Sequence, residues 1–139
     1  MKEDFVTYDL AVKLKEKGFK ERCYAYYFPK GSELFFNHNP FRGGIVEDCL
    51  YSHNSLPNEC MASDFVDAPQ IHEVLKWLRN EKKLFVEPSL FKYGYESYVQ
   101  STIFKEDKDY TDTWRVEGFH STYEQAALAG IEYVIDNLI

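Results

Sequence analysis

The stretch from Asp67 to Asn80 constrains the fold of this chain most, because it joins the signals of a helix start to a helical apolar stripe. Asp67 is predicted to be the N-cap, since its carboxylate can accept hydrogen bonds from the free N–H groups of the first turn. Gln70 completes a capping box, and Pro69 falls in the first turn, where its missing N–H costs nothing. The stripe consists of residues spaced i, i+3, i+4 and i+7: Ile71, Val74, Leu75 and Leu78.

Before this helix, the sequence predicts a helix at residues 7–17 and a strand at residues 22–28. Thr7 is the expected N-cap of that helix. Gly18 stands where a left-handed residue ends a helix, so that Phe19 closes a Schellman motif. The strand carries apolar or aromatic side chains on both faces, which indicates a central position in a sheet.

Residues 29–66 follow without a regular pattern. They hold Pro29, Pro40 and Pro57 together with scattered Asn, Ser and Gly, a composition typical of turns and loops. Short extended pieces are expected at residues 33–36 and 45–51. A loop of this length inside a compact domain indicates either a functional segment or hidden structure.

The sequence of the second half of the chain predicts several strands joined by short turns. Alternation predicts strands at residues 84–86, 95–104 and 113–119, joined by turns at residues 92–94 and 105–113. Pro88 confines the first strand to a sheet edge or a bulge, because proline cannot donate to the ladder.

The chain closes with a helix expected at residues 122–138, for which Ser121 and Glu124 would form a capping box. Its apolar stripe consists of Tyr123, Ala127, Ile131, Val134 and Leu138, flanked by Leu128 and Ile135. Small residues at 126, 127, 129 and 130 would let this helix lie close against a sheet.

These elements predict a single α+β domain over residues 1–139, with an irregular segment at residues 29–66. The expected order is α-β-(long loop)-α-β-β-β-α. An antiparallel sheet of about four strands with three helices packed on it buries the apolar face of every element.

The net charge of -7 and the composition argue against several classes of partner and location. No basic field is present, which argues against nucleic acids and anionic membranes as partners. The start of the sequence lacks the apolar core of a signal peptide, and no stretch has the 18 apolar residues of a membrane span. The three cysteines do not make a disulfide framework. A cytoplasmic location is therefore expected.

Residues 38–60 carry potential zinc ligands, namely His38, Cys49, His53 and Cys60. Only Cys49 and His53 have the spacing of a ligand pair, and no C-x-x-C is present. A metal-binding protein or an enzyme that uses this segment, with Cys49 and His53 as nucleophile and base, is one alternative function. Ordinary loop and core residues explain the segment better.

Other motifs match less well. Asp107, Asp109 and Asp112 resemble the start of a calcium loop, but Asp112 and Gly118 hold the positions that require Gly and Glu. No phosphate loop or nucleophile elbow is present. We therefore assign no catalytic, cofactor-binding or metal residues and expect no cofactor.

A winged-helix-like DNA-binding protein is another alternative, with the helix at residues 67–80 as recognition helix and the following hairpin as wing. Its phosphate contacts would come from Lys76, Arg79, Lys82, Lys83 and Lys92, and Gln70, His72 and Asn80 would lie near bases. Glu73 and Glu81 interrupt this basic face, which favours a solvated helix surface.

The aromatic content favours binding of a protein partner or a homo-oligomer. Eleven Tyr and eleven Phe are present, and large aromatic side chains anchor many interfaces. The expected anchors are Tyr24, Tyr26, Tyr93, Tyr95 and Tyr98.

Four parts of the sequence also carry a resemblance: Met1–Val6, Leu14–Phe19, Ala68-Pro69 with Val74–Arg79, and Tyr123–Glu132. They resemble a family of small uncharacterised proteins from gut bacteria (Bacteroides-type) and their phages or mobile elements. Gln70 stands where that family is expected to carry Thr. The resemblance implies the α+β fold and brings no activity, so a phage- or mobile-element-type accessory protein that binds protein without catalysis is the expected function.

Overall fold

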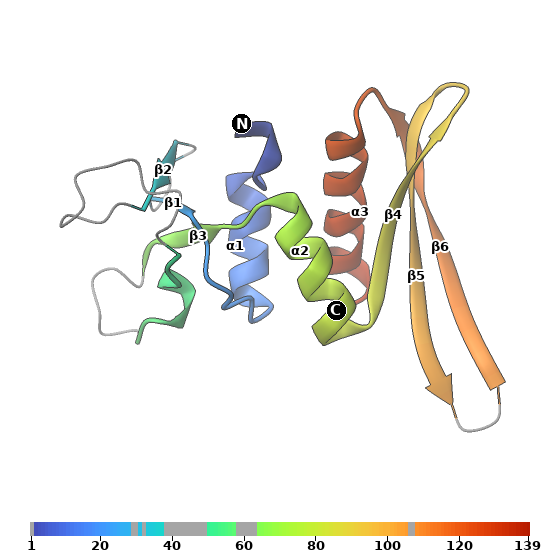
Figure 1. The fold of residues 1–139 in the computed structure, drawn as a ribbon, viewed down its shortest axis with the longest axis horizontal. Coiled ribbons are helices and arrows are strands. Elements are labelled where there is room, and N and C mark those ends of the chain that lie inside the picture. Colours follow the sequence, from blue (N-terminus) through green and yellow to red (C-terminus); the bar gives the residue numbers. More distant parts are fainter. Residues whose placement is uncertain (1, 29–30, 32, 38–49, 58–63, 106–107) are drawn as a thin grey trace. The chain divides into compact units, whose positions relative to one another are not determined.

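The computed structural model describes residues 2–28, 31, 33–37, 50–57, 64–105 and 108–139, with the backbone alone for residues 2, 102–105 and 108–111. The chain divides into two compact units, Met1–Gln70 and Ile71–Ile139 (Figure 1). The described elements confirm the α+β class but form two three-stranded antiparallel sheets, so the single four-stranded sheet is wrong. One domain over residues 1–139 stays a prediction.

The first unit contains helix α1 (Tyr8–Glu16), and the predicted residues set both of its ends. Thr7 Oγ1 accepts a hydrogen bond from a backbone N–H of the first turn. Gly18 has a left-handed φ of +89°, and the Phe19 N–H donates to the Leu14 carbonyl over 3.0 Å. The Schellman ending is therefore confirmed, and Phe19 is fully buried.

The first sheet has the order β2-β1-β3, formed by Leu34–Phe36, Ala25–Tyr27 and Val66–Ala68. The central position predicted for β1 is confirmed, and β2 lies within the extended piece expected at residues 33–36. Tyr27 faces α1, where its hydroxyl donates to the Val6 carbonyl over 2.7 Å and its ring contacts Tyr8. Burial raises the pKa of Tyr27.

Asp67 belongs to strand β3 rather than to a helix, which corrects the predicted N-cap and capping box. It lies opposite Tyr26 in the ladder, and Gln70 forms an antiparallel bridge with Phe5. Pairing with β1 uses the backbone of this segment, so the helix begins only after Gln70. Pro69 therefore lies before the helix and not in its first turn.

Helix α2 spans Ile71–Trp77 and continues as a π-helical turn, Leu78–Lys82. Lys83 ends it with a left-handed φ of +55°, a conformation that costs energy for a residue with a Cβ atom. The predicted apolar stripe of this helix is confirmed, because all four of its residues are buried: Ile71, Val74, Leu75 and Leu78.

The second unit has a sheet of order β4-β5-β6, formed by Leu84–Phe91, Gly94–Lys105 and Lys108–His120. Pro88 lies on the edge strand β4, as predicted, and the turn after β4 has two residues. The polar turn predicted at residues 105–113 is too long. Cross-strand pairing continues to Lys105 opposite Lys108, so ladder formation overrides the polar composition.

Helix α3 (Tyr123–Asn137) starts one residue later than predicted, and its N-cap lies one residue after the predicted cap, Ser121. Thr122 Oγ1 accepts a hydrogen bond from the Gln125 N–H over 3.2 Å, while Ser121 donates to the Gln125 side chain. Thr122 and not Ser121 is the N-cap, because its hydroxyl reaches the free first-turn amide.

The same helix lies against one face of the second sheet (Figure 1). Ser97 on β5 donates a hydrogen bond to the Ala126 carbonyl of α3. A Cβ atom at Gly130 would overlap Val86 Cγ1 and would lie 3.1 Å from the Ser97 Cβ, so the close approach expected from the small residues is confirmed.

Candidate functional site

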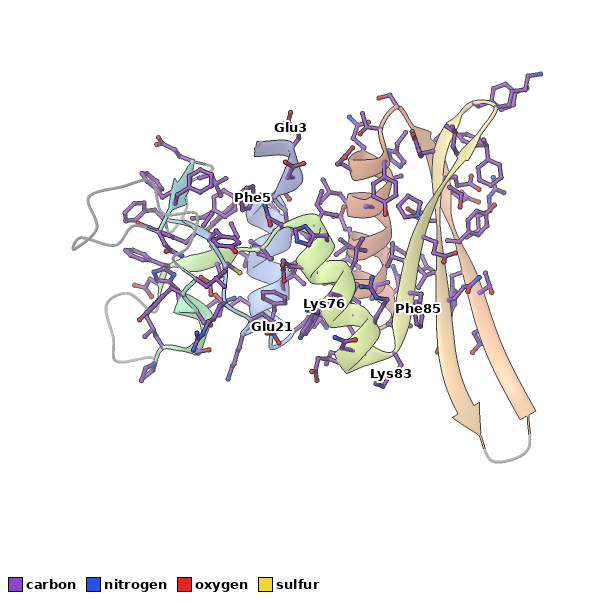
Figure 2. The ribbon with its side chains drawn as sticks, in the orientation of Figure 1. Glu3, Phe5, Glu21, Lys76, Lys83 and Phe85 are labelled. Carbon is purple, nitrogen blue, oxygen red and sulfur yellow. The ribbon has the colours of Figure 1, made fainter. Side chains whose placement is uncertain are left out.

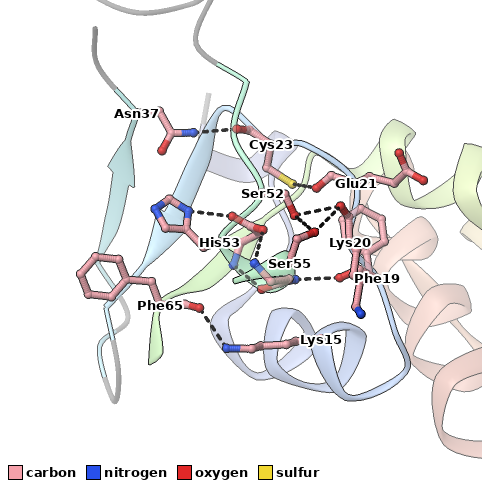
Figure 3. Close-up of polar contacts among 12 residues, drawn as sticks. Lys15, Phe19, Lys20, Glu21, Cys23, Asn37, Ser52, His53, Ser55 and Phe65 are labelled. Carbon is pink, nitrogen blue, oxygen red and sulfur yellow. Dashed lines mark hydrogen bonds and ion pairs between the residues drawn. The ribbon is translucent and has the colours of Figure 1, made fainter. Parts of the chain in front are cut away.

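A buried polar centre forms in the first unit around Asp67, and Figure 3 shows His53, Phe19 and the neighbouring polar contacts. The Asp67 side chain is fully buried and accepts hydrogen bonds from His53 Nδ1 over 3.0 Å and from the Asn54 backbone N–H over 2.9 Å. The Asp67 N–H in turn donates to Asn54 Oδ1, and Asn54 Nδ2 donates to the Phe19 carbonyl. This network ties the short 3-10 helix His53–Ser55 to β3 and to the end of α1.

The two ring nitrogens of His53 differ in their environment, since Nδ1 is hydrogen-bonded to Asp67 and Nε2 has no partner among the described residues. Because an ionised carboxylate only accepts, Asp67 assigns the donor role to Nδ1. Among the described residues, no partner bonds Nε2. A carboxylate that orients an imidazole in this way is found both at metal ligands and at general bases.

Aromatic rings enclose the imidazole. Tyr26 and Tyr51 each lie 4.7 Å from the His53 ring, and Phe65 lies 5.6 Å away. Tyr26 also stacks on Phe65 at 5.3 Å, so the rings form a continuous cluster on the face of β1 opposite Tyr27.

The predicted zinc ligands are only partly placed. His38, Cys49 and Cys60 lie outside the described residues, and His53 is the one member of the set with a described environment. In the part of the chain that the structure describes, no group of three His, Cys, Asp or Glu side chains is arranged to hold a metal ion. Asp109 and Asp112 belong to β6 and not to a turn, and Asp107 lies outside the described residues.

The basic residues proposed to contact DNA begin on α2 and continue beyond its end. Figure 2 shows Lys76 on α2 and Lys83 immediately before β4. Both side chains are exposed, and Lys83 Nζ donates to a carbonyl of the preceding turn. Strand β3 and not a helix precedes α2, and Glu73 pairs with His72 over 3.1 Å. DNA binding through this helix stays a prediction.

A second candidate site is an exposed aromatic surface at the end of the β4–β5 hairpin. Its residues, which we call the hairpin-end surface, lie around the end of the hairpin on both faces of β4, because Leu90 and Phe91 are consecutive residues of the strand: Leu90, Phe91, Tyr93, Phe119 and Tyr123. Tyr93 is 74% exposed and Leu90 is 68% exposed, although both are large and apolar for most of their surface. Exposed apolar patches of this kind mark interaction sites more often than single exposed residues do.

Ring contacts join this surface to the sheet. Tyr93 contacts Phe119 at 5.9 Å, Phe91 contacts Tyr98 at 6.1 Å, and Tyr95, which lies opposite Leu90, contacts Tyr123. Strand pairing and α3 hold these side chains on regular elements, and Tyr93 lies in the short turn between two of the strands. The surface is therefore pre-organised, which lowers the entropy cost of binding.

A charge pair between the buried Glu96 and the exposed Arg115 lies beside the surface. Arg115 holds both oxygens of Glu96, through Nε at 2.8 Å and Nη2 at 2.9 Å, and Tyr98 donates its hydroxyl to Glu96. Glu96 is 2% exposed. The hydrogen bonds from Arg115 hold the pKa of Glu96 below its ordinary value, and the bond to Glu96 raises the pKa of Tyr98.

The predicted aromatic anchors belong to both units. Tyr24 and Tyr26 lie in the first unit and are half-buried, whereas Tyr93, Tyr95 and Tyr98 lie on the hairpin of the second unit. Sequence reasoning missed the other members of the hairpin-end surface. Apolar residues on both sides of the predicted turn at residues 92–94 were the signal that could have identified Leu90 and Phe91.

Comparison with protein-family models, with curated proteins and with solved structures gives no match. Among the described residues, no helix has both the length and the apolar character to cross a membrane.

Proposed function

We propose that this chain is a small cytoplasmic module that binds protein without catalysis, and that its binding site is the hairpin-end surface. The partner is another protein or a second copy of the chain. The resemblance of the two ends and the central helix would make it an accessory protein of a phage or a mobile element.

The observation that carries the proposal is the exposure of Tyr93 in the two-residue hairpin turn and of Leu90 near the end of β4. A large apolar side chain gains free energy when it leaves water, about 1.5–3 kcal/mol for a Leu-sized group. The neighbouring rings of Phe91 and Phe119 extend the area that a partner would bury. Aromatic residues held on rigid elements are the typical energetic centres of interfaces.

Photo-crosslinking in the organism that encodes the chain tests this assignment. Tyr93→p-benzoylphenylalanine places a reactive group on the surface, and Leu50→p-benzoylphenylalanine is the matched control because Leu50 is 43% exposed in the first unit. We expect a discrete adduct from position 93, which is lost when Leu90→Ser is added and is absent from position 50. A cross-linking pattern that is the same at both positions would refute the proposal. Nuclease treatment before analysis separates direct contacts from contacts bridged by nucleic acid.

A second candidate function is metal binding or acid–base chemistry at residues 38–60. The observation that favours it is the Asp67–His53 hydrogen bond, which orients the imidazole and leaves Nε2 without a bond among the described residues. Stoichiometric zinc in the purified protein, lost in His53→Ala, is the expected result. Metal-free protein with unchanged stability after zinc addition would eliminate this candidate.

A further inference from the structure

We infer that the exposed side of α2 and of the turn after it binds the phosphate backbone of nucleic acid without reading the base sequence. The residues that carry this inference are Lys76, Arg79 and Lys83, which we call the basic row. The row and the hairpin-end surface lie at opposite ends of β4, whose eight residues span about 27 Å. The inference therefore goes beyond the proposed function and does not depend on it.

The three cations of the basic row lie on one side of the helix. Lys76 and Arg79 are three residues apart, a spacing that makes them neighbours on a helix surface. Lys83 follows the π-helical turn, and its Nζ donates to the Asn80 carbonyl over 2.9 Å, so this side chain turns back onto the helix end beside Arg79. All three cations are exposed, while the apolar stripe of α2 is buried on the other side.

No carboxylate neutralises the basic row. In the part of the chain that the structure describes, no ion pair joins its three cations to Asp or Glu. Glu73, on the same helix, pairs with His72 over 3.1 Å. Residues 76–83 hold four Lys or Arg and one Glu, in a chain whose net charge is -7. Positive charge is thus concentrated at this helix end, where an anionic partner would neutralise it.

The composition of this surface favours nucleic acid over an acidic protein. The exposed side chains of residues 71–83 are all polar or charged: His72, Lys76, Arg79, Asn80, Glu81, Lys82 and Lys83. A protein partner gains most of its affinity from apolar and aromatic side chains at the centre of an interface, and these residues offer none. Interfaces with nucleic acid are more polar and more positively charged, and phosphate contacts supply much of their affinity.

The backbone at the end of the basic row gives independent support. The helix ends in a π-helical turn, and Lys83 has a left-handed φ of +55°. Glycine would adopt this conformation without the steric cost that a side chain brings. Strained backbone is found most often at functional sites. A phosphate contact from residue 83 gives a reason for lysine at a position that suits glycine better.

The acidic remainder of the chain limits this binding to short range. At physiological salt, charges separated by more than about 8 Å are largely screened, so the basic row acts on phosphates that lie close to it. Three phosphate contacts without base contacts would give weak, sequence-independent binding, with a dissociation constant of about 10⁻⁴–10⁻⁶ M.

Fluorescence anisotropy of the whole chain with labelled duplex DNA tests the inference. Two unrelated sequences should bind equally, and a plot of log K against log salt should have a slope of about -2.7, which is -0.9 for each of three phosphate contacts. Single-stranded RNA is the second probe, and the tighter of the two complexes identifies the nucleic acid. Absence of binding at low salt, or a strong preference for one duplex sequence, would overturn the inference.

Substitutions in the basic row supply the second measurement. Lys76→Gln/Arg79→Gln should reduce the size of the slope by about 1.8, and Lys83→Gly should reduce it by about 0.9. Loss of binding in Lys83→Gly does not come from a weaker fold, because glycine fits the left-handed φ of this residue.

Lys92→Gln is the matched control, because Lys92 is exposed and lies just beyond the other end of β4. It should change the affinity less than about twofold, as expected for a distant surface charge. An equal loss in the control would overturn the inference, since total charge and not the basic row would then govern binding. Competition by polyglutamate as strong as that by duplex DNA would also overturn it and would assign the row to an acidic protein.

Discussion

The substitution Asp67→Asn distinguishes between two structural roles of Asp67, an exposed helix N-cap and a buried hydrogen-bond acceptor. At an exposed N-cap, asparagine replaces aspartate with almost no cost, because both side chains accept the same first-turn hydrogen bond. In the buried centre, Asp67 accepts from two donors at once, His53 Nδ1 and the Asn54 N–H. An amide presents only one oxygen, so its NH₂ group must face one of these donors.

The loss of stability in Asp67→Asn can be calculated from the hydrogen bonds that change. Each bond to the carboxylate is charge-assisted and contributes about 1.5–3 kcal/mol, whereas a neutral bond contributes about 0.5–1.5 kcal/mol. The imidazole can relieve the clash if its proton moves from Nδ1 to Nε2, after which Nδ1 accepts from the new NH₂ group. Two weakened bonds then lower the free energy of unfolding of the first unit by about 2 kcal/mol.

Amide hydrogen exchange measures this change unit by unit. The opening free energy of amides in β1 and β3 should fall in Asp67→Asn, while amides in β5 keep the wild-type value. Asp64→Asn is the control, since Asp64 is exposed and the substitution is the same. Nitrogen NMR of His53 should show the proton on Nε2. Stability within about 0.3 kcal/mol of wild type, the error expected for non-interacting changes, would refute the buried role of Asp67.

Three further predictions concern the second unit, whose stability can be followed by the fluorescence of the two tryptophans because both lie in it. Lys83→Gly should raise the free energy of unfolding by about 0.5–1 kcal/mol, because glycine adopts the left-handed φ without a steric penalty; a loss of stability would contradict the strain assigned there. Gly130→Ala should lower it by about 1–2 kcal/mol, since overpacking against Val86 and Ser97 exceeds the gain in helix propensity; unchanged stability would show that α3 can move away from the sheet. Glu96→Gln should lower it at neutral pH. The depressed pKa of Glu96 makes its contribution present above the unfolded value of about 4.3 and lost as pH falls, so the difference between variant and wild type should shrink in acid. A difference that is constant with pH would exclude an ionic role for the bond to Arg115.

Local chemistry explains which parts of the fold could be predicted from sequence. The ends of α1 were predictable because Thr7 and Gly18 act on their own turn of backbone. The edge position of Pro88 was predictable for the same reason, since a missing N–H excludes proline from the interior of a sheet.

Long-range pairing explains the errors. Asp67 carries every local signal of an N-cap, but β1, far away in the sequence, takes its backbone into a sheet. The same applies to residues 108–112, whose polar composition predicts a turn while pairing with β5 makes them a strand. The sequence suggested His53 as a potential metal ligand, but it did not suggest Asp67 as the partner of His53. The reason is that the 3-10 helix that brings His53 to Asp67 has no sequence signature of its own.

The two sheets also differ in how far apart their paired residues lie along the chain. In the second sheet every strand pairs with its neighbour in sequence, whereas β1 must find β3 across the whole irregular segment. Closing a longer loop costs more entropy, and folding slows as contacts become less local. During refolding, the β4–β5–β6 meander should therefore gain its tryptophan signal before exchange protection appears in β1 and β3. If protection appears first in β1 and β3, loop closure does not limit the folding of this chain.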